Sequence, residues 1–156
     1  MTRVKIAVFS DSHGYMDLMV AAVEEEQPDR IFFLGDNLRD GRALARLHPQ
    51  IPMDLLRGNC DFGPGEDERV LELEGVRFLL VHGHRQGAKS GTEGLVRAGR
   101  ACGAGMVCFG HTHQAVNLWD GTLPRLFNPG TAGGVRARRG YGILEVRDGR
   151  VEGWLK

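Results

Sequence analysis

Carboxylate, amide and imidazole side chains recur in this sequence directly after short apolar runs and beside glycines. The first of these motifs is Asp11-Ser12-His13-Gly14, which follows a run rich in Val, Ile and Phe. The later motifs are Gly35-Asp36, Gly58-Asn59, His82-Gly83-His84 and Gly110-His111-Thr112-His113. Oxygen and nitrogen ligands that converge on one point are the beginning of a metal site.

Each motif taken alone also has an ordinary structural interpretation. Asp11 can cap a helix, His13 can be a surface loop residue, and Asn59 is a common turn residue. However, five of the six histidines fall in these motifs, and only His48 lies outside them. We interpret His48 as a charge at the end of a helix, without a function. The repetition favours a metal site, because adjacent glycines let the backbone turn sharply beside a ligand.

The ligand types indicate which metal chemistry to expect. A set without a thiolate cluster excludes a Cys-rich structural zinc site and suits a hydrolytic centre of Mn, Fe, Ni, Co or Zn. More candidates are present than one tetrahedral ion needs: Asp11, His13, Asp36, Asn59, His82, His111 and His113. Two ions bridged by a carboxylate and a hydroxide would use them, and such pairs, ~3.5–4 Å apart, hold a phosphoryl group for in-line attack.

The elements that must position these residues alternate between strands and helices in the first half of the chain. Apolar runs predict buried strands at residues 4–9, 30–34 and 53–56, and helical spacing predicts helices at 16–26 and 40–47. Strands joined by a helix are usually parallel. Asp11 and Asp36 should therefore lie at the carboxyl edge of one sheet, where open α/β sheets bind ligands.

The second half is predominantly β. We expect a strand at residues 106–109, a helix at 93–102, and hairpins at 69–73/76–81, 114–119/123–127 and 141–146/151–155. The whole pattern predicts an α/β fold, a four-layer sandwich of two mixed β-sheets flanked by α-helices. Residues 1–156 are expected to form a single domain. Trp119 and Trp154 are expected in the core. The alternative is that they form a surface for contact with another copy of the chain, in which case the protein could be a homodimer.

Composition excludes several classes of partner. The 20 basic and 20 acidic residues balance, so no broad nucleic-acid-binding or membrane-binding field is expected. Three cysteines without a pairing pattern suit a reducing cytoplasm. No apolar run approaches the ~20 residues that span a bilayer or has the form of a signal peptide. We therefore expect a cytoplasmic protein.

The motifs, in their order and from residue 4 to about 146, resemble the calcineurin-like metallophosphoesterase superfamily. They are most similar to its small YfcE-like phosphodiesterase branch. The resemblance implies a phosphoesterase, and more narrowly a phosphodiesterase, that hydrolyses a small phosphoester by in-line attack of a metal-bridging hydroxide. The alternative is a non-catalytic protein-interaction scaffold of the same fold, like the retromer subunit. Filled ligand positions favour the enzyme.

The resemblance also implies a role for each motif. Asp11, His13 and His113 would hold one ion, while Asn59, His82 and His111 would hold the other, with Asp36 as the bridge. Manganese is the expected metal, with nickel, iron, cobalt or zinc as alternatives. Asn59 would also stabilise charge on the phosphoryl oxygens.

One position departs from the larger members of the superfamily, which carry a histidine after the asparagine. Here that position is Cys60, which we interpret as a buried thiol and a poor proton donor. His84 is the nearest substitute as a catalytic acid. Its alternative role is to orient a metal ligand.

Other residues are candidates for contacts around the site. Asn37 and Arg85 are predicted to bind substrate, although a solvated basic loop is an ordinary alternative for Arg85. The Asn128-Pro129-Gly130 turn resembles the closing loop of the family and should pack beneath the site. A basic cluster near residues 136–139 could meet a phosphate-rich substrate, but a solvated surface is the simpler interpretation.

Overall fold

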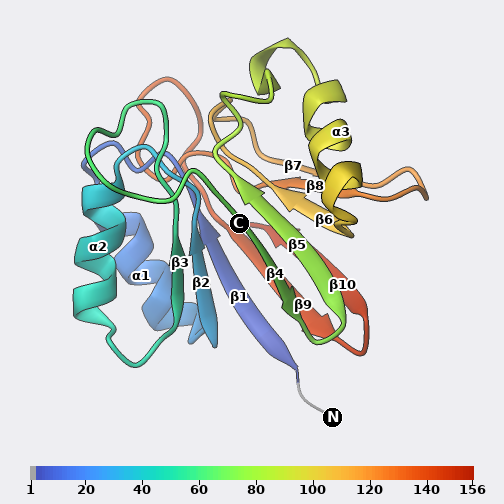
Figure 1. Cartoon of the computed structure of the whole chain (residues 1–156). Helices are drawn as coiled ribbons and strands as arrows, with labels where there is room; N and C mark the ends of the chain where they lie inside the picture. Colours follow the sequence, from blue (N-terminus) through green and yellow to red (C-terminus); the bar gives the residue numbers. More distant parts are fainter. Residues whose placement is uncertain (1–2) are drawn as a thin grey trace.

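The computed structural model describes residues 3–156, which form two five-stranded sheets packed face to face (Figure 1). The first sheet has the order β10-β9-β1-β2-β3. Its strands are β1 (Val4–Phe9), β2 (Arg30–Phe33), β3 (Met53–Leu55), β9 (Gly142–Arg147) and β10 (Arg150–Leu155). β1, β2 and β3 are parallel, which confirms the strand–helix–strand prediction for the first half of the chain.

The second sheet has the order β4-β5-β6-β8-β7. Its strands are β4 (Glu68–Leu73), β5 (Val76–Val81), β6 (Met106–Cys108), β7 (Val116–Leu118) and β8 (Arg125–Asn128). β5, β6 and β8 are parallel to one another. The predicted hairpins are confirmed as the antiparallel pairs β4–β5, β7–β8 and β9–β10, so both sheets are mixed.

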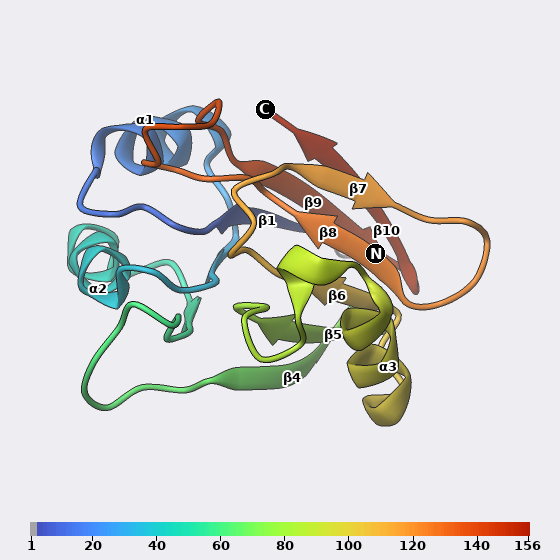
Figure 2. The same ribbon diagram turned by 90° about the horizontal axis from the view of Figure 1, so that it is seen from above.

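Helices cover the outer faces of both sheets. Within the described residues they are α1 (Asp17–Glu26), α2 (Leu38–Leu47) and α3 (Glu93–Cys102), together with a short 3-10 turn, η1 (Ala88–Ser90), that the sequence did not predict. Looking down on the sandwich, α1 and α2 lie on one side and α3 on the other (Figure 2). The order helix–sheet–sheet–helix confirms the predicted four-layer sandwich.

The core lies in three layers that follow from the apolar patterning of the strands. Phe32 and Phe78 meet edge to face between the two sheets, with ring centroids 5.6 Å apart. Met19 and Leu44 are fully buried under the first sheet. α2 approaches that sheet closely because residue 41 is glycine: a Cβ there would lie 2.8 Å from the Phe33 ring.

The topology brings the carboxyl ends of the parallel strands of both sheets to one edge, the upper edge in Figure 1. Within the first sheet, the amide of Asp11 donates to the carbonyl of Gly35 at 2.9 Å. Within the second, the amide of Gly110 donates to the carbonyl of His82 at 2.9 Å. The motif residues therefore follow their strands into a common region, as the sequence predicted.

The two tryptophans are not in the core, and this part of the sequence-based prediction is wrong. Trp119 is 59% exposed because it follows β7, an edge strand, into a surface loop. Trp154 is 40% exposed on the other sheet's edge strand. Val151, three residues earlier on β10, packs against the core. Because side chains alternate between the two faces of a strand, Trp154 points to the opposite face.

The helix predicted at residues 40–47 begins two residues earlier, at Leu38, whose free amide is satisfied by Asp61 Oδ1 at 2.9 Å. His48 is at its C-cap, as interpreted from the sequence. In the part of the chain that the structure describes, none of the helices has the length and apolar character needed to cross a membrane.

Candidate metal centre

The first group of potential ligands consists of Asp11, His13 and His113, whose ligand atoms lie within 4.8 Å of one another. Asp11 and His13 follow β1, and His113 follows β6. The Nε2 atoms of the two histidines face each other at 3.1 Å. Asp11 Oδ1 lies 3.3 Å from His113 Nε2 and 3.8 Å from His13 Nε2. Three ligand atoms from two sheets thus converge on one point.

The second group consists of Asp36, His82 and His111, again within 4.8 Å of one another. Asp36 follows β2, His82 follows β5, and His111 follows β6. Asp36 Oδ2 lies 3.4 Å from His82 Nε2. The rings of His82 and His111 are 5.1 Å apart in an edge-on arrangement. The sequence-predicted histidines and carboxylates therefore gather into two adjacent clusters.

The backbone at these residues adopts a conformation that L-amino acids rarely take. Left-handed φ angles occur at five of the seven predicted ligands: Asp11 (54°), His13 (47°), Asp36 (52°), His111 (69°) and His113 (62°). Such residues persist only where the surrounding structure holds them, and they cluster at functional sites. The strain is therefore independent support for a function at this edge.

Asp11 presents one oxygen to the protein and the other to the histidines. Its Oδ2 accepts hydrogen bonds from the Ser10 hydroxyl and, at 2.9 Å, from the His111 amide. Its Oδ1 is buried without a hydrogen-bond partner. A buried carboxylate oxygen without a donor is costly unless a cation approaches it. The site therefore suits a positive ion beside Asp11 Oδ1.

His82 is also prepared to act as a ligand. Its Nδ1 lies 2.8 Å from the carbonyl oxygen of Leu34, which can only accept a hydrogen bond, so Nδ1 carries the proton. In the neutral ring, Nε2 then offers its lone pair to the cluster, and it is buried without a hydrogen-bond partner. A histidine oriented by a carbonyl in this way is the usual arrangement at a metal.

The two clusters are in contact with each other. His82 Nε2 lies 3.8 Å from Asp11 Oδ1, so the oxygen that faces the first group also approaches the second. The Asp36 side chain contacts the second group, through His82, and the loop after β3, while the Asp36 carbonyl accepts from the His13 amide at 3.4 Å. The role of Asp36 as the bridging carboxylate stays a prediction.

The charges of the site favour a bound cation. Burial opposes the ionisation of Asp36, but His82 and the Cys60 amide outweigh it and hold the pKa of Asp36 well below its usual range. Burial likewise opposes protonation of His82, but Asp36 and Asp11 raise its pKa. The Asp11 carboxylate, whose Oδ1 lies 3.3 Å from His113 Nε2, raises the pKa of His113. Negative carboxylates therefore draw positive charge into the cluster, as a proton or as a metal ion.

Asn59 lies in a loop that packs closely against Asp36. The amide of Cys60 donates to Asp36 Oδ1 at 2.9 Å. Gly58 permits this approach, since a Cβ there would lie 2.1 Å from the same oxygen. The Asn59 side-chain amide lies 3.7 Å from Cys60 Sγ, and its role as a metal ligand stays a prediction.

Cys60 is exposed, so the interpretation of a buried thiol is wrong. The residue lies in the turn after β3, outside the layers of the sandwich. Partial desolvation and the nearby Asp36 carboxylate nevertheless raise the pKa of its thiol. The conclusion that Cys60 is a poor proton donor therefore rests on this raised pKa, to which partial desolvation contributes most and the Asp36 carboxylate next.

The remaining predicted site residues lie around this centre. The His84 ring is 5.3 Å from that of His82, and burial and His82 lower the pKa of His84. The Arg85 side chain is 62% exposed and pairs with Asp67 at 3.3 Å, which turns it to the rim. Asn37 is half-buried at the start of α2. Their roles as acid and substrate contacts stay predictions.

Two carboxylates that the sequence-based reasoning missed hold the ligand loops in place. Asp40 Oδ2 accepts hydrogen bonds of 2.7 Å from the Ser12 hydroxyl and the Gly14 amide. Asp61 accepts from the amides of Asp36 (3.0 Å), Gly58 (2.8 Å) and Leu38 (2.9 Å). Neither residue follows an apolar run beside a glycine, so the pattern that revealed the ligands could not reveal them.

The turn predicted to close the site lies beneath the histidine loop. Asn128 is buried, and its amide nitrogen donates to the carbonyl of Gly110 at 3.1 Å and to the Thr112 hydroxyl at 3.0 Å. Thr131 donates to the Asp11 carbonyl at 2.7 Å. Both residues support the backbone on which the ligands are held.

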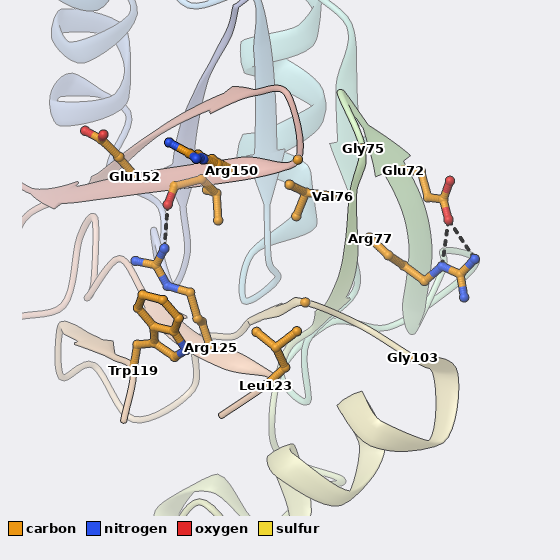
Figure 3. Close-up of a pocket in the computed structure, with 13 residues that line it drawn as sticks. Glu72, Gly75, Val76, Arg77, Gly103, Trp119, Leu123, Arg125, Arg150 and Glu152 are labelled. Carbon is orange, nitrogen blue, oxygen red and sulfur yellow. Dashed lines mark hydrogen bonds and ion pairs between the residues drawn. The ribbon is translucent and has the colours of Figure 1, made fainter. Parts of the chain in front are cut away.

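A separate cavity of about 670 Å³ lies at the opposite edge, near the amino ends of β5, β8 and β10. In Figure 3, Arg77 is paired with Glu72, and Arg125 lies beside Trp119. None of the predicted ligands lines this cavity. It is therefore distinct from the candidate metal centre.

The family model and the curated relatives that match this chain are all described as phosphoesterases. Residues 4–149 match the model of the calcineurin-like phosphoesterase superfamily domain. The probable metallophosphoesterase YsnB of Bacillus subtilis (strain 168) is 32% identical over 152 residues, covering 93% of this chain and 86% of the relative.

Solved structures share the fold over nearly all of the chain. A predicted phosphoesterase from Streptococcus pneumoniae TIGR4 has a TM-score of 0.76 at 25% identity, covering 95% of this chain and 86% of that chain. YfcE, a phosphoesterase from E. coli, has a TM-score of 0.66 at 20% identity, with coverages of 90% and 87%. Vps29 from Entamoeba histolytica, complexed with zinc, has a TM-score of 0.76 at 16% identity, with coverages of 94% and 88%. The last two likenesses concern the fold alone.

Proposed function

Because the chain belongs to the calcineurin-like phosphoesterase superfamily, we propose that it is a metal-dependent phosphoesterase, and more specifically a phosphodiesterase. The observation that carries this proposal is the pair of ligand groups whose facing atoms, Asp11 Oδ1 and His82 Nε2, are buried without hydrogen-bond partners. Such an arrangement fits cations better than it fits a packed protein interior.

We assign two divalent ions to the site. Asp11, His13 and His113 would hold one, and Asn59, His82 and His111 the other, with Asp36 between them. When bound, the ions would lower the pKa of a water molecule and neutralise charge on the phosphoryl group. Oxygen and nitrogen ligands suit manganese, the ion we propose, although supply in the cell also decides occupancy.

The protein's own side chains would then orient the substrate and manage its charge. The Asn59 amide would donate to a phosphoryl oxygen as negative charge builds there. His84 would act as the catalytic acid at the rim, while Asn37 and Arg85 would contact the ester group. His13 and Asn59 are exposed, so a small phosphoester could reach the site from solvent.

Metal removal tests the proposal. Treatment with a chelator should abolish hydrolysis of bis(p-nitrophenyl) phosphate, and added Mn²⁺ should restore it, because the proposed ions would activate the water and neutralise charge on the phosphoryl group. p-Nitrophenol release is followed by absorbance. Turnover that is unaffected by the chelator would refute the proposed metal dependence. No turnover by protein whose bound metal has been verified would refute the proposal of an enzyme.

The identity of residue 60 should set the preference for leaving groups. A thiol with a raised pKa protonates a departing alkoxide poorly, so the wild type should favour activated diesters with nitrophenyl groups. Cys60→His should raise the relative kcat/KM for esters with poor leaving groups by about tenfold. The ratio of rates on nitrophenyl and alkyl esters measures this, and an unchanged ranking would count against the idea.

A protein-binding scaffold of the same fold is the competing function, because Vps29 shares the architecture. In this chain the six residues of the two groups carry metal-ligating side chains, which a metal-dependent enzyme requires. The chelator experiment separates the two functions. We also propose a cytoplasmic location, which suits three cysteines that form no disulfide among the described residues.

A further inference from the structure

A cavity of about 330 Å³ adjoins the first ligand group at His113. Arg138 and Arg139, from the loop between β8 and β9, and Lys156 contribute cationic side chains to its wall. No aspartate or glutamate is among the described residues that line it. Figure 2 shows this loop beside α1, which follows the Asp11–Gly14 motif. The cavity is therefore a positively charged extension of the candidate site.

The loop is fixed to the metal-ligand backbone through Gly134. A Cβ at Gly134 would lie 3.0 Å from His113 Nδ1, so the loop lies directly against that ring. The Gly134 amide donates to Thr131 Oγ1 at 2.7 Å, and the Thr131 hydroxyl donates to the carbonyl of Asp11, also at 2.7 Å. The position of the loop is thus coupled to the first ligand group.

The Arg139 head group is held in place without a carboxylate. Its Nε donates to the Gly134 carbonyl at 3.1 Å, and its guanidinium carbon lies 4.2 Å from the centroid of the Tyr15 ring. No ion pair to Arg138 or Arg139 is found within residues 3–156, whereas Lys156 lies 3.7 Å from Glu26. One N–H of Arg139 is used, and the others are available to an anion.

We propose that Arg138 and Arg139 form a second anion subsite, which binds a non-scissile phosphate group of the substrate. The inference rests on the proposed function, because the scissile ester would lie at the neighbouring metal centre. A guanidinium presents paired donors that match phosphate oxygens, and a head group already held in position loses little freedom on binding. The substrate class is a phosphodiester that carries an additional phosphate.

A matched pair of substrates tests the subsite. Thymidine 5′-(p-nitrophenyl phosphate) and its 3′-phosphorylated analogue have the same reacting ester and differ by one phosphate. The wild type should show about a tenfold higher kcat/KM for the analogue. The Arg138→Ala/Arg139→Ala double variant should bring this ratio, measured within the variant, close to one.

Arg150→Ala is the control, because Arg150 is an exposed arginine in the distant cavity of Figure 3. This variant should retain the wild-type ratio. Circular dichroism verifies folding, and the two single variants give the same comparison if the double variant does not fold. A wild-type ratio near one, or a ratio that survives the double substitution, would overturn the subsite.

Calorimetry separates this inference from the proposed function. Thymidine 3′,5′-bisphosphate should bind the Mn²⁺-loaded protein about tenfold more tightly than thymidine 5′-monophosphate, and the double variant should lose the difference. If neither nitrophenyl substrate is hydrolysed but the arginine-dependent difference in binding persists, the enzyme activity is refuted and the subsite stands. Equal binding of the two nucleotides would refute the subsite alone.

Discussion

Asp36→Asn should lower the hydrolysis of bis(p-nitrophenyl) phosphate by more than about 100-fold, because even residues that only orient metal ligands contribute 10- to 100-fold. The substitution removes the negative charge while keeping size and tolerance of the left-handed backbone at φ 52°. It leaves His82 facing a neutral amide instead of a carboxylate 3.4 Å away. Activity and metal content, measured by elemental analysis, should both fall, the latter from two ions per chain to one or fewer.

Asp148→Asn is the matched control for this variant. Asp148 also has a left-handed φ, of 50°, but it is exposed in the turn between β9 and β10. The same chemical change should leave activity and metal content unaltered there. Wild-type turnover in Asp36→Asn would contradict the assignment of Asp36 as a ligand of the metals.

Gly110→Ala should destabilise the fold and abolish activity together. A Cβ at residue 110 would lie 1.9 Å from Ser10 Oγ and 2.6 Å from Asp11 Oδ2. These atoms are buried, so one strand end must shift, at a cost of about 1–3 kcal/mol for overpacking. The shift displaces Asp11 from the histidines. Urea unfolding measures the free energy of unfolding, and the nitrophenyl assay measures activity.

Gly105→Ala is the appropriate comparison, because it adds the same methyl group at the other end of β6. The atoms nearest to its Cβ, the Arg77 carbonyl oxygen and Val76 Cγ1, lie 3.7 Å away, an ordinary contact distance. This variant should keep both stability and activity. If Gly110→Ala is as stable and as active as Gly105→Ala, the close packing of Ser10 and Asp11 is not needed for the site.

The layers of the fold were predictable because buried strands and helix faces require apolar residues at regular spacings, and these spacings are visible in the sequence. β2 has an uninterrupted apolar run that ends in Gly35-Asp36, and a parallel strand buried on both faces requires such a run. The tryptophans show the limit of this reasoning. Their apolar side chains indicate burial, but Trp119 and Trp154 lie at edge strands, and edge position is a property of the sheet order.

The ligands were predictable from chemistry and spacing, but their geometry was not. Nothing in the sequence indicates that Asp11 and His113 adopt left-handed backbone angles, since local propensity disfavours them and only the tertiary structure imposes them. Asp40 and Asp61 act through hydrogen bonds to backbone amides of other segments. Contacts of that kind depend on which loops meet, and they leave no pattern near the residues themselves.

Titration of metal-free protein with Mn²⁺, with bound metal and hydrolysis of bis(p-nitrophenyl) phosphate recorded at each step, tests the central claim most directly. Two ligand groups that act on one phosphoryl group require both sites to be filled. Turnover should therefore appear as the second equivalent binds and stop rising at two ions per chain. Full activity with a single bound ion, or no activity with two, would contradict a two-metal phosphoesterase.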